Sequence, residues 1–152
     1  MAAMLSIVHS ALSVSDLDRS ISFYRDVLGL TLELGPTEIT EGRELADGVG
    51  VPNARLRQAI LAAEQGKVEL IEYVHPPRPS DKPPPQNVLG AIHIAFKVNN
   101  AEAKMEELKA KGVEFHTPLN IIEDGPLKGW KWVYFKDPDG ITLELVEAGP
   151  AD

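Results

Sequence analysis

Alternation of apolar and polar positions, with a period of two residues, predicts strands in both halves of this chain. The first half has such stretches at residues 5–14, 30–34, 54–63 and 67–74. The second half has them at residues 91–98, 113–116, 128–135 and 141–147. The pattern in the second half thus repeats that in the first.

A helical spacing of apolar residues follows the first strand of each half. Over residues 17–28 the apolar stripe begins after Ser15, the expected N-cap, and ends at Gly29. Over residues 101–111 a second stripe ends at Gly112. Each half therefore reads as βαβββ, and the predicted fold class is α+β.

Two segments interrupt the pattern. Residues 35–53 are rich in glycine, proline and acidic residues and predict a long loop with one helical turn. Residues 76–89 are rich in proline and predict an extended linker without secondary structure. We expect this linker to join two modules, 5–75 and 90–148, of a single domain covering 1–152, because neither module has enough core alone.

The last predicted strand carries a carboxylate between aliphatic residues. Residues 137–140, Asp-Pro-Asp-Gly, predict a tight turn before it. Beyond the turn, Leu143 and Leu145 share one face and Glu144 lies on the other. A carboxylate at such a position is costly to bury unless it is paired or binds a metal. Glu144 therefore requires a partner.

Histidine and glutamate motifs occur twice. VELIE, which contains Glu69, matches LELVE, which contains Glu144, and the strand with His9 matches the strand with His93. Small residues beside each histidine leave space on its face. Imidazole and carboxylate ligands suit Zn²⁺, Ni²⁺, Co²⁺, Fe²⁺ or Mn²⁺, and four protein ligands leave two octahedral positions open. We predict one divalent metal ion bound by His9, Glu69, His93 and Glu144, although Glu69 taken alone would read as a solvated carboxylate.

Aromatic residues alternate onto one face of the strand predicted at residues 128–135. Trp130, Trp132 and Tyr134 would either line a pocket for an apolar or aromatic substrate or fill the core of the sheet. The sequence leaves these two interpretations open.

Other charged and titratable residues fit a site less well. A structural or solvated role is expected for Glu72, His75, His116 and Glu147. Candidates for carboxylate or phosphate contacts are Arg43, Arg55, Arg57 and Lys128.

Composition excludes several classes of protein. With 15 Lys and Arg against 23 Asp and Glu, the net charge of −8 argues against nucleic acid as a partner. The absence of cysteine excludes disulfides and thiolate chemistry and suits a reducing compartment. The first ten residues lack the basic region of a signal peptide, and no apolar run approaches the ~20 residues of a membrane span. We expect a cytoplasmic protein with no membrane partner.

With these motifs in place, the chain resembles the vicinal oxygen chelate superfamily, which includes glyoxalase I, methylmalonyl-CoA epimerase, extradiol dioxygenases, and the fosfomycin and bleomycin resistance proteins. The resemblance is carried by HSALSVSDLDRSISFYRDVLGL, VELIEY, IHIAFKV and YFKDPDGITLELVE. It implies two βαβββ modules that form one curved mixed sheet cup around the metal, and a homodimer.

Four metal ligands resemble the glyoxalase I and epimerase branch, because the fosfomycin-type and extradiol branches have no carboxylate at the position of Glu69. The extradiol branch also has a histidine shortly before Tyr134, which is absent here. Ser13 and Tyr73 stand where bacterial glyoxalase I has residues used for glutathione, and Gln58 where the epimerase has a second acid. Ser13 and Gln58 thus belong to the expected substrate pocket, and glutathione and two-base epimerisation are disfavoured.

Three functions follow from the resemblance. The first is a metal-dependent lyase or isomerase for a small substrate chelated through adjacent oxygens, with Glu144 or Glu69 removing a proton α to a carbonyl. The second is an Fe²⁺-dependent ring-cleaving dioxygenase or other oxygenase, which the aromatic strand favours. The third is a non-enzymatic binding protein of the bleomycin-resistance kind, against which the complete ligand set counts.

Overall fold

The structure is a computed structural model that describes residues 5–149. Residues 1–4, which begin the segment judged unlike a signal peptide, and residues 150–152 lie outside the described part. The chain divides into two compact units, Met1–Asp81 and Lys82–Asp152, with the boundary inside the proline-rich segment. Among residues 5–149, no helix is both long and apolar enough to cross a membrane.

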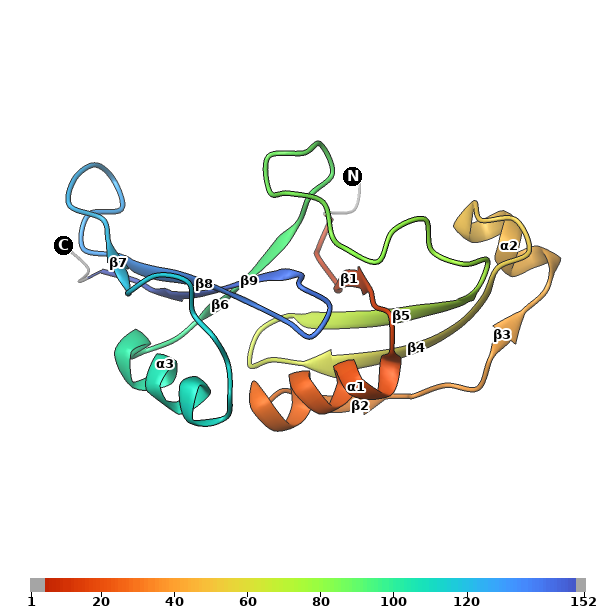
Figure 1. The fold of residues 1–152 in the computed structure, drawn as a ribbon, viewed down its shortest axis with the longest axis horizontal. Helices are drawn as coiled ribbons and strands as arrows, with labels where there is room; N and C mark the ends of the chain where they lie inside the picture. Colours follow the sequence, from red (N-terminus) through yellow and green to blue (C-terminus); the bar gives the residue numbers. More distant parts are fainter. Residues whose placement is uncertain (1–4, 150–152) are drawn as a thin grey trace. The chain divides into compact units, whose positions relative to one another are not determined.

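The first unit contains one mixed sheet with strand order β1-β5-β4-β2, to which β3 adds by pairing with β4 (Figure 1). β1 runs parallel to β5, whereas the other neighbours are antiparallel. Its elements are β1 (Ser10–Ser13), α1 (Leu17–Ser22), the π-helix η1 (Phe23–Val27), β2 (Thr31–Leu34), β3 (Thr40–Glu41), α2 (Arg43–Val49), β4 (Arg55–Ala62) and β5 (Lys67–His75).

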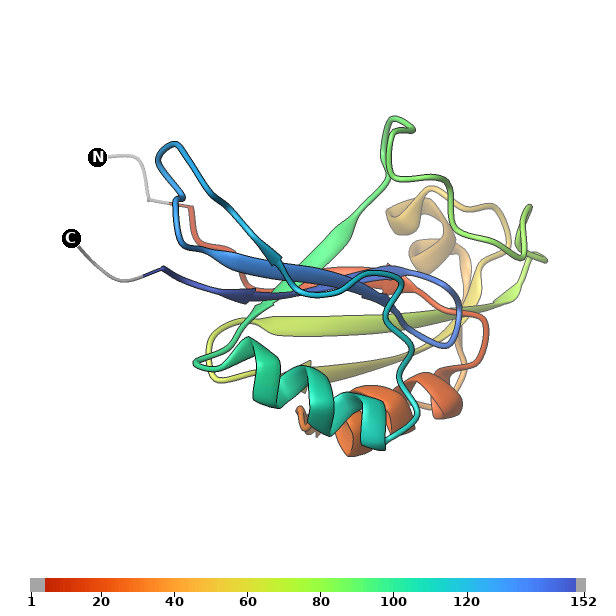
Figure 2. The same ribbon diagram turned by 60° about the vertical axis from the view of Figure 1, so that its left-hand side comes forward.

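The second unit repeats this arrangement with strand order β6-β9-β8-β7, and β6 runs parallel to β9. Its elements are β6 (His93–Lys97), α3 (Ala101–Ala110), β7 (Asn120–Ile121), β8 (Lys131–Lys136) and β9 (Thr142–Glu147). α3 lies along one face of its sheet (Figure 2). The α+β class and the repeated βαβββ order are confirmed, with two mixed sheets and an insertion of β3 and α2 in the first unit.

The core of each unit lies between the helix and the sheet face that it covers. In the first unit α1 and η1 bury the predicted stripe, and Leu28 is only half-buried. In the second unit, Ala101, Met105 and Leu108 of the helix and Leu143 and Leu145 of β9 are buried as predicted, whereas Ile94 and Phe96 of β6 are only half-buried. Full burial of an aliphatic side chain contributes about 1.5–3 kcal/mol, which explains why alternation alone located these faces.

Some predicted boundaries were wrong. Asp16, not Ser15, caps α1, because its backbone is extended and its carboxylate accepts a hydrogen bond from Arg19 N at 2.9 Å. β1 begins at Ser10, so the predicted residues 5–9 lie outside the ladder. No strand forms over residues 113–116; Phe115 makes an isolated bridge and β7 forms later in the chain.

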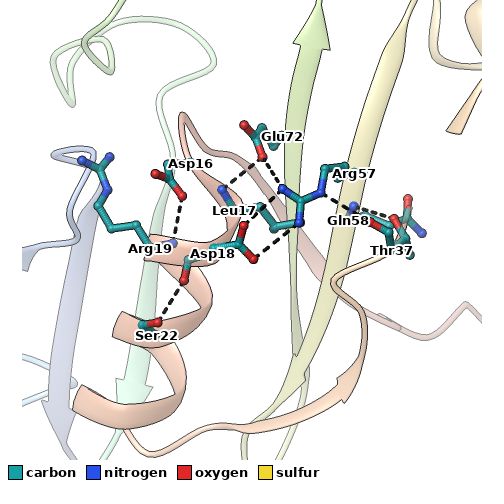
Figure 3. Close-up of polar contacts among 9 residues, drawn as sticks. All are labelled: Asp16, Leu17, Asp18, Arg19, Ser22, Thr37, Arg57, Gln58 and Glu72. Carbon is teal, nitrogen blue, oxygen red and sulfur yellow. Dashed lines mark hydrogen bonds and ion pairs between the residues drawn. The ribbon is translucent and has the colours of Figure 1, made fainter. Parts of the chain in front are cut away.

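A polar network ties the start of α1 to its sheet (Figure 3). The Glu72 carboxylate on β5 accepts a hydrogen bond from Leu17 N, the first residue of α1, at 3.3 Å. Arg57, the neighbour of Glu72 on β4, lies between two carboxylates, with Nη1 3.5 Å from Glu72 Oε2 and 3.2 Å from Asp18 Oδ2. The positive end of the helix thus faces a carboxylate.

The second unit contains the same network. Glu147 Oε2 accepts a hydrogen bond from Ala101 N, the first residue of α3, at 2.6 Å. Lys131 Nζ lies 3.3 Å from Glu147 Oε1 and 3.0 Å from Glu102 Oε1. The structural role expected for Glu72 and Glu147 is confirmed, and both face away from the side of the sheet described next.

Candidate metal centre

The turn between β8 and β9 sets the register of Glu144. The Asp137 carboxylate accepts hydrogen bonds from Asp139 N at 2.9 Å and Ile141 N at 2.8 Å, and Gly140 has φ of 83°. Glycine takes this left-handed conformation without the steric cost of a side chain. The predicted turn is confirmed, and it places Tyr134 opposite Glu144.

Glu144 has His93 as its partner in the second unit. His93 begins β6, two residues before Ala95, which is the register partner of Glu144 on the parallel strand β9. The two side chains therefore lie on the same face of the sheet, and His93 Nε2 is 3.3 Å from Glu144 Oε2. The carboxylate is 13% exposed and the imidazole 40%, so the pair is open to solvent on the histidine side.

The first unit contains an equivalent pair. His9 lies two residues before Ala11, and Ala11 is the register partner of Glu69 on β5. His9 Nε2 is 3.0 Å from Glu69 Oε2, and the carboxylate is again 13% exposed. The sequence repeat is thus also a repeat in three dimensions, although His9 itself precedes the strand.

Each pair has donor chemistry and spacing that fit a metal ion. Ligand bonds of 2.0–2.2 Å at right angles place two donor atoms about 3.0 Å apart. The 3.0 Å and 3.3 Å separations are close to this value. Each unit brings together two of the predicted ligands, and no group of three or more His, Cys, Asp or Glu side chains suited to a metal occurs within residues 5–149.

Burial raises the pKa of two groups in the second unit. Removal from water raises the pKa of Glu144 above its ordinary value, and the nearby His93 partly opposes this rise. Burial, and then the negative charge of Glu144, raise the pKa of Tyr134. Tyr134 therefore stays protonated, with its ring centroid 5.3 Å from that of His93.

The predicted aromatic residues are on the His93–Glu144 face. Tyr134 and Trp132 pack edge to face with centroids 5.1 Å apart, and both are half-buried. Val133 and Phe135, which alternate with them, are fully buried and fill the core instead. Trp130 is also half-buried, just before β8. Trp132 and Tyr134 thus do not fill the core, and their place in a substrate pocket stays a prediction.

Ser13 and Gln58, the pocket residues predicted in the first unit, lie in one row across the sheet. Both have Ile71 as their register partner, from β1 on one side and β4 on the other. Gln58 is held in place by Thr37, which accepts a hydrogen bond from Gln58 N at 3.1 Å. This row lies two residues along β5 from Glu69, on the same face of the sheet.

The remaining candidates are either in ion pairs or exposed. Arg43, Arg55 and Arg57 form ion pairs with Asp47, with Glu41, and with Asp18 and Glu72. Arg43 and Arg55 border a hollow beside β3 and α2 that contains none of the four predicted ligands. The side chains of His75, His116 and Lys128 are exposed.

Sequence reasoning overlooked Lys97 at the end of β6. Alternation puts His93, Ala95 and Lys97 on one face, and all three are exposed, whereas Ile94 and Phe96 are half-buried. The four-residue spacing from His93 to Lys97 in the sequence already indicated that the two residues share a face of the strand.

Comparison with known proteins identifies the family of the chain. The profile of the Glyoxalase/Bleomycin resistance protein/Dioxygenase superfamily matches residues 6–145. The chain belongs to this superfamily. The glyoxalase superfamily is the family expected from the motifs, and its members carry divalent metals as a rule.

Relatives in the glyoxalase superfamily include named enzymes. The chain is 32% identical to 2-epi-5-epi-valiolone epimerase of Actinomyces sp, over 93% of this chain and 79% of the relative. It is 32% identical to lactoylglutathione lyase of Haemophilus influenzae, over 94% and 93%. A glyoxalase family protein of Bacillus cereus has the same fold, with a TM-score of 0.79, 22% identity, and coverage of 98% and 97%.

Proposed function

We propose that this protein is a divalent-metal-dependent isomerase or lyase that removes a proton α to a carbonyl of a small substrate with adjacent oxygens. The proposal rests on one observation: each unit holds an imidazole and a carboxylate 3.0–3.3 Å apart at equivalent register positions. We propose that His9, Glu69, His93 and Glu144 together hold one ion. A Ni²⁺, Co²⁺, Zn²⁺, Mn²⁺ or Fe²⁺ ion would supply Lewis acidity to the two substrate oxygens.

Glu144 is the better candidate for the general base. Burial raises its pKa, so its carboxylate holds a proton more strongly than an exposed glutamate does. Trp132 and Tyr134 on the neighbouring strand exclude water from one side of it. Glu144 would accept the proton on its carboxylate, while His9, His93 and Glu69 would remain ligands of the ion.

The named relatives support this class of reaction. One is an epimerase and another is a lyase, each about one third identical to this chain over nearly all of it. Ser13 and Gln58 are neutral where charged partners would be needed for glutathione or for a second acid–base group. These residues favour a substrate other than lactoylglutathione and a single base.

Metal content is the first test. The purified protein, loaded with each of the five cations and desalted, is expected to retain about one ion per chain by elemental mass spectrometry. His93→Ala should lose the ion, because a ligand is removed, whereas His116→Ala, at an exposed histidine far along the chain, should retain it. Retention by His93→Ala, or no retention by the wild type, would contradict the proposal.

Proton exchange tests the reaction. In D₂O, the metal-loaded protein should catalyse deuterium incorporation next to the carbonyl of 2-epi-5-epi-valiolone or a related hydroxyketone, followed by NMR. Glu144→Gln should lower this rate by about 10³-fold or more, because the amide cannot accept the proton. An active Glu144→Gln variant would assign the base elsewhere.

An oxygenase is the second candidate, favoured by the aromatic face formed by His93, Trp132 and Tyr134. Oxygen consumption by the Fe²⁺-loaded protein with catechol or hydroquinone would support it. Catalysed deuterium exchange without oxygen consumption would support the isomerase or lyase. A protein that takes up no metal would instead fit the binding protein of the bleomycin-resistance kind.

A further inference from the structure

Lys97 occupies a distinctive position on the face that carries His93 and Glu144. β6 runs from His93 to Lys97, and its alternate residues His93, Ala95 and Lys97 are exposed on this face. Two strand residues span about 6.6 Å, so the Cα of Lys97 lies one row beyond the row of Ala95 and Glu144. The long side chain of lysine can cover that distance.

Within residues 5–149, the side chain of Lys97 has no hydrogen bond or ion pair. Other strand lysines do: Lys67 pairs with Glu33, Lys131 with Glu102 and Glu147, and Lys136 Nζ donates to Thr142 Oγ1 at 2.6 Å. An unpaired cation is notable in a chain with 23 acidic and 15 basic residues. The ammonium group of Lys97 is therefore available to a ligand.

Next to Lys97, the same row across the sheet contains an apolar and an aromatic side chain. Val146 on β9 is the register partner of both Lys97 on β6 and Trp132 on β8. The next row holds Ala95, Glu144 and Tyr134. A small molecule held at His93 and Glu144 thus has an apolar surface beside it and a positive charge at the edge of that surface.

The equivalent row in the first unit carries no charge. Ser13, Ile71 and Gln58 occupy the positions that correspond to Lys97, Val146 and Trp132. The two His–Glu pairs are nearly identical, but the rows beside them differ by one unit of charge. This difference in charge favours one orientation of a bound substrate.

We propose that Lys97 is a specificity-determining residue that binds an anionic oxygen group, carboxylate or phosphate, on the substrate. The inference rests on the proposed function, because it requires the adjacent oxygens of the substrate to lie at His93 and Glu144. The preferred substrates are then anionic hydroxycarbonyl compounds, oriented with the anionic group toward the end of β6.

Hydroxamates provide probes with adjacent oxygens whose charged substituent can be varied. Binding to the metal-loaded protein is measured by isothermal titration calorimetry for three hydroxamates: acetohydroxamate, whose substituent is uncharged, phosphoglycolohydroxamate, and malonic monohydroxamate. The wild type should bind at least one anionic probe about tenfold more tightly than acetohydroxamate, the size of one charge-assisted hydrogen bond. The comparison of the two anionic probes distinguishes phosphate from carboxylate.

Variants isolate the contribution of the cation. Lys97→Met should abolish the preference for the anionic probe and leave acetohydroxamate binding unchanged, and Lys97→Arg should keep the preference. Lys109→Met, which removes an equal charge from helix α3, is the matched control and should also keep it. Equal affinities in the wild type, or an unchanged preference in Lys97→Met, would overturn the inference while acetohydroxamate binding still supports the metal centre. Failure of all three probes to bind would overturn both.

Discussion

At the scale of one residue, the burial of Glu144 keeps a candidate functional carboxylate in place at a cost in folding stability. Its carboxylate is 13% exposed, and burial raises its pKa from the ordinary value of 4.5. A carboxyl group with a raised pKa in the folded state binds protons more tightly there than in the unfolded chain. The folded protein therefore loses stability as the pH rises from about 4.5 through the folded-state pKa.

This pH dependence predicts that Glu144→Gln, the variant expected to abolish activity, is more stable than the wild type. Glu144→Gln resembles the protonated acid, so the metal-free variant should have a higher Tm than the metal-free wild type at pH 8. The gain should shrink as the pH falls through the folded-state pKa and vanish below about 4.5, where Glu144 is protonated in both states. Thermal unfolding in EDTA across this pH range measures it, with Glu114→Gln, at an exposed glutamate, as the control. A lower Tm for Glu144→Gln at pH 8 would mean that the His93 pair outweighs the cost of burial.

At the scale of elements, the same device anchors the helix in both units. Glu72 and Glu147 each accept a hydrogen bond from the first backbone amide of a helix, at Leu17 and at Ala101. A cation from the neighbouring strand joins that carboxylate to an acidic residue of the helix's first turn. These contacts fix the helix against the sheet, and hence hold the core face opposite the His–Glu face.

Removal of either anchoring carboxylate should weaken its unit. Glu147→Ala is expected to lower the free energy of unfolding by about 1–2 kcal/mol, because Ala101 N loses its acceptor and Lys131 loses one of its two partners. Urea unfolding followed by circular dichroism measures this, with Glu106→Ala on the exposed side of α3 as the control. Glu72→Ala should behave in the same way. Equal midpoints for Glu147→Ala and Glu106→Ala would show that water replaces the anchor at no cost.

At the scale of the whole molecule, apolar residues are exposed next to both histidines. Leu5 and Ile7 before His9 are 101% and 89% exposed, and Leu89 before His93 is 102% exposed. Such clusters of exposed aliphatic side chains are typical of surfaces that another chain covers. They support the homodimer expected from the family resemblance.

Analytical ultracentrifugation tests the dimer. The wild type should sediment as a dimer at micromolar concentration, and Ile7→Asp should shift it toward monomer, because a charge would be buried in the contact. Ile39→Asp, at an aliphatic residue with 42% exposure outside these segments, should remain dimeric. A monomeric wild type would contradict the prediction, as would a dimeric Ile7→Asp variant.

The sequence by itself determined the features that depend on local periodicity. Alternation located the faces of β6, β8 and β9, and the 3.6-residue period located the buried side of α3. The Asp-Pro-Asp-Gly turn and the internal repeat of His and Glu were equally readable. Each rests on contacts between near neighbours or on direct comparison of two stretches of the chain.

Only the tertiary structure decided which residues meet across the sheets. Parallel pairing of β1 with β5, and of β6 with β9, turns a repeated motif into His–Glu contacts of 3.0 and 3.3 Å. Pairing of β9 with both β6 and β8 places Lys97 and Trp132 in one row, and helix packing brings Glu72 and Glu147 to the first amides of α1 and α3. Local pattern gives the face of a strand but not its register, because register is fixed by hydrogen bonds between segments far apart in the chain.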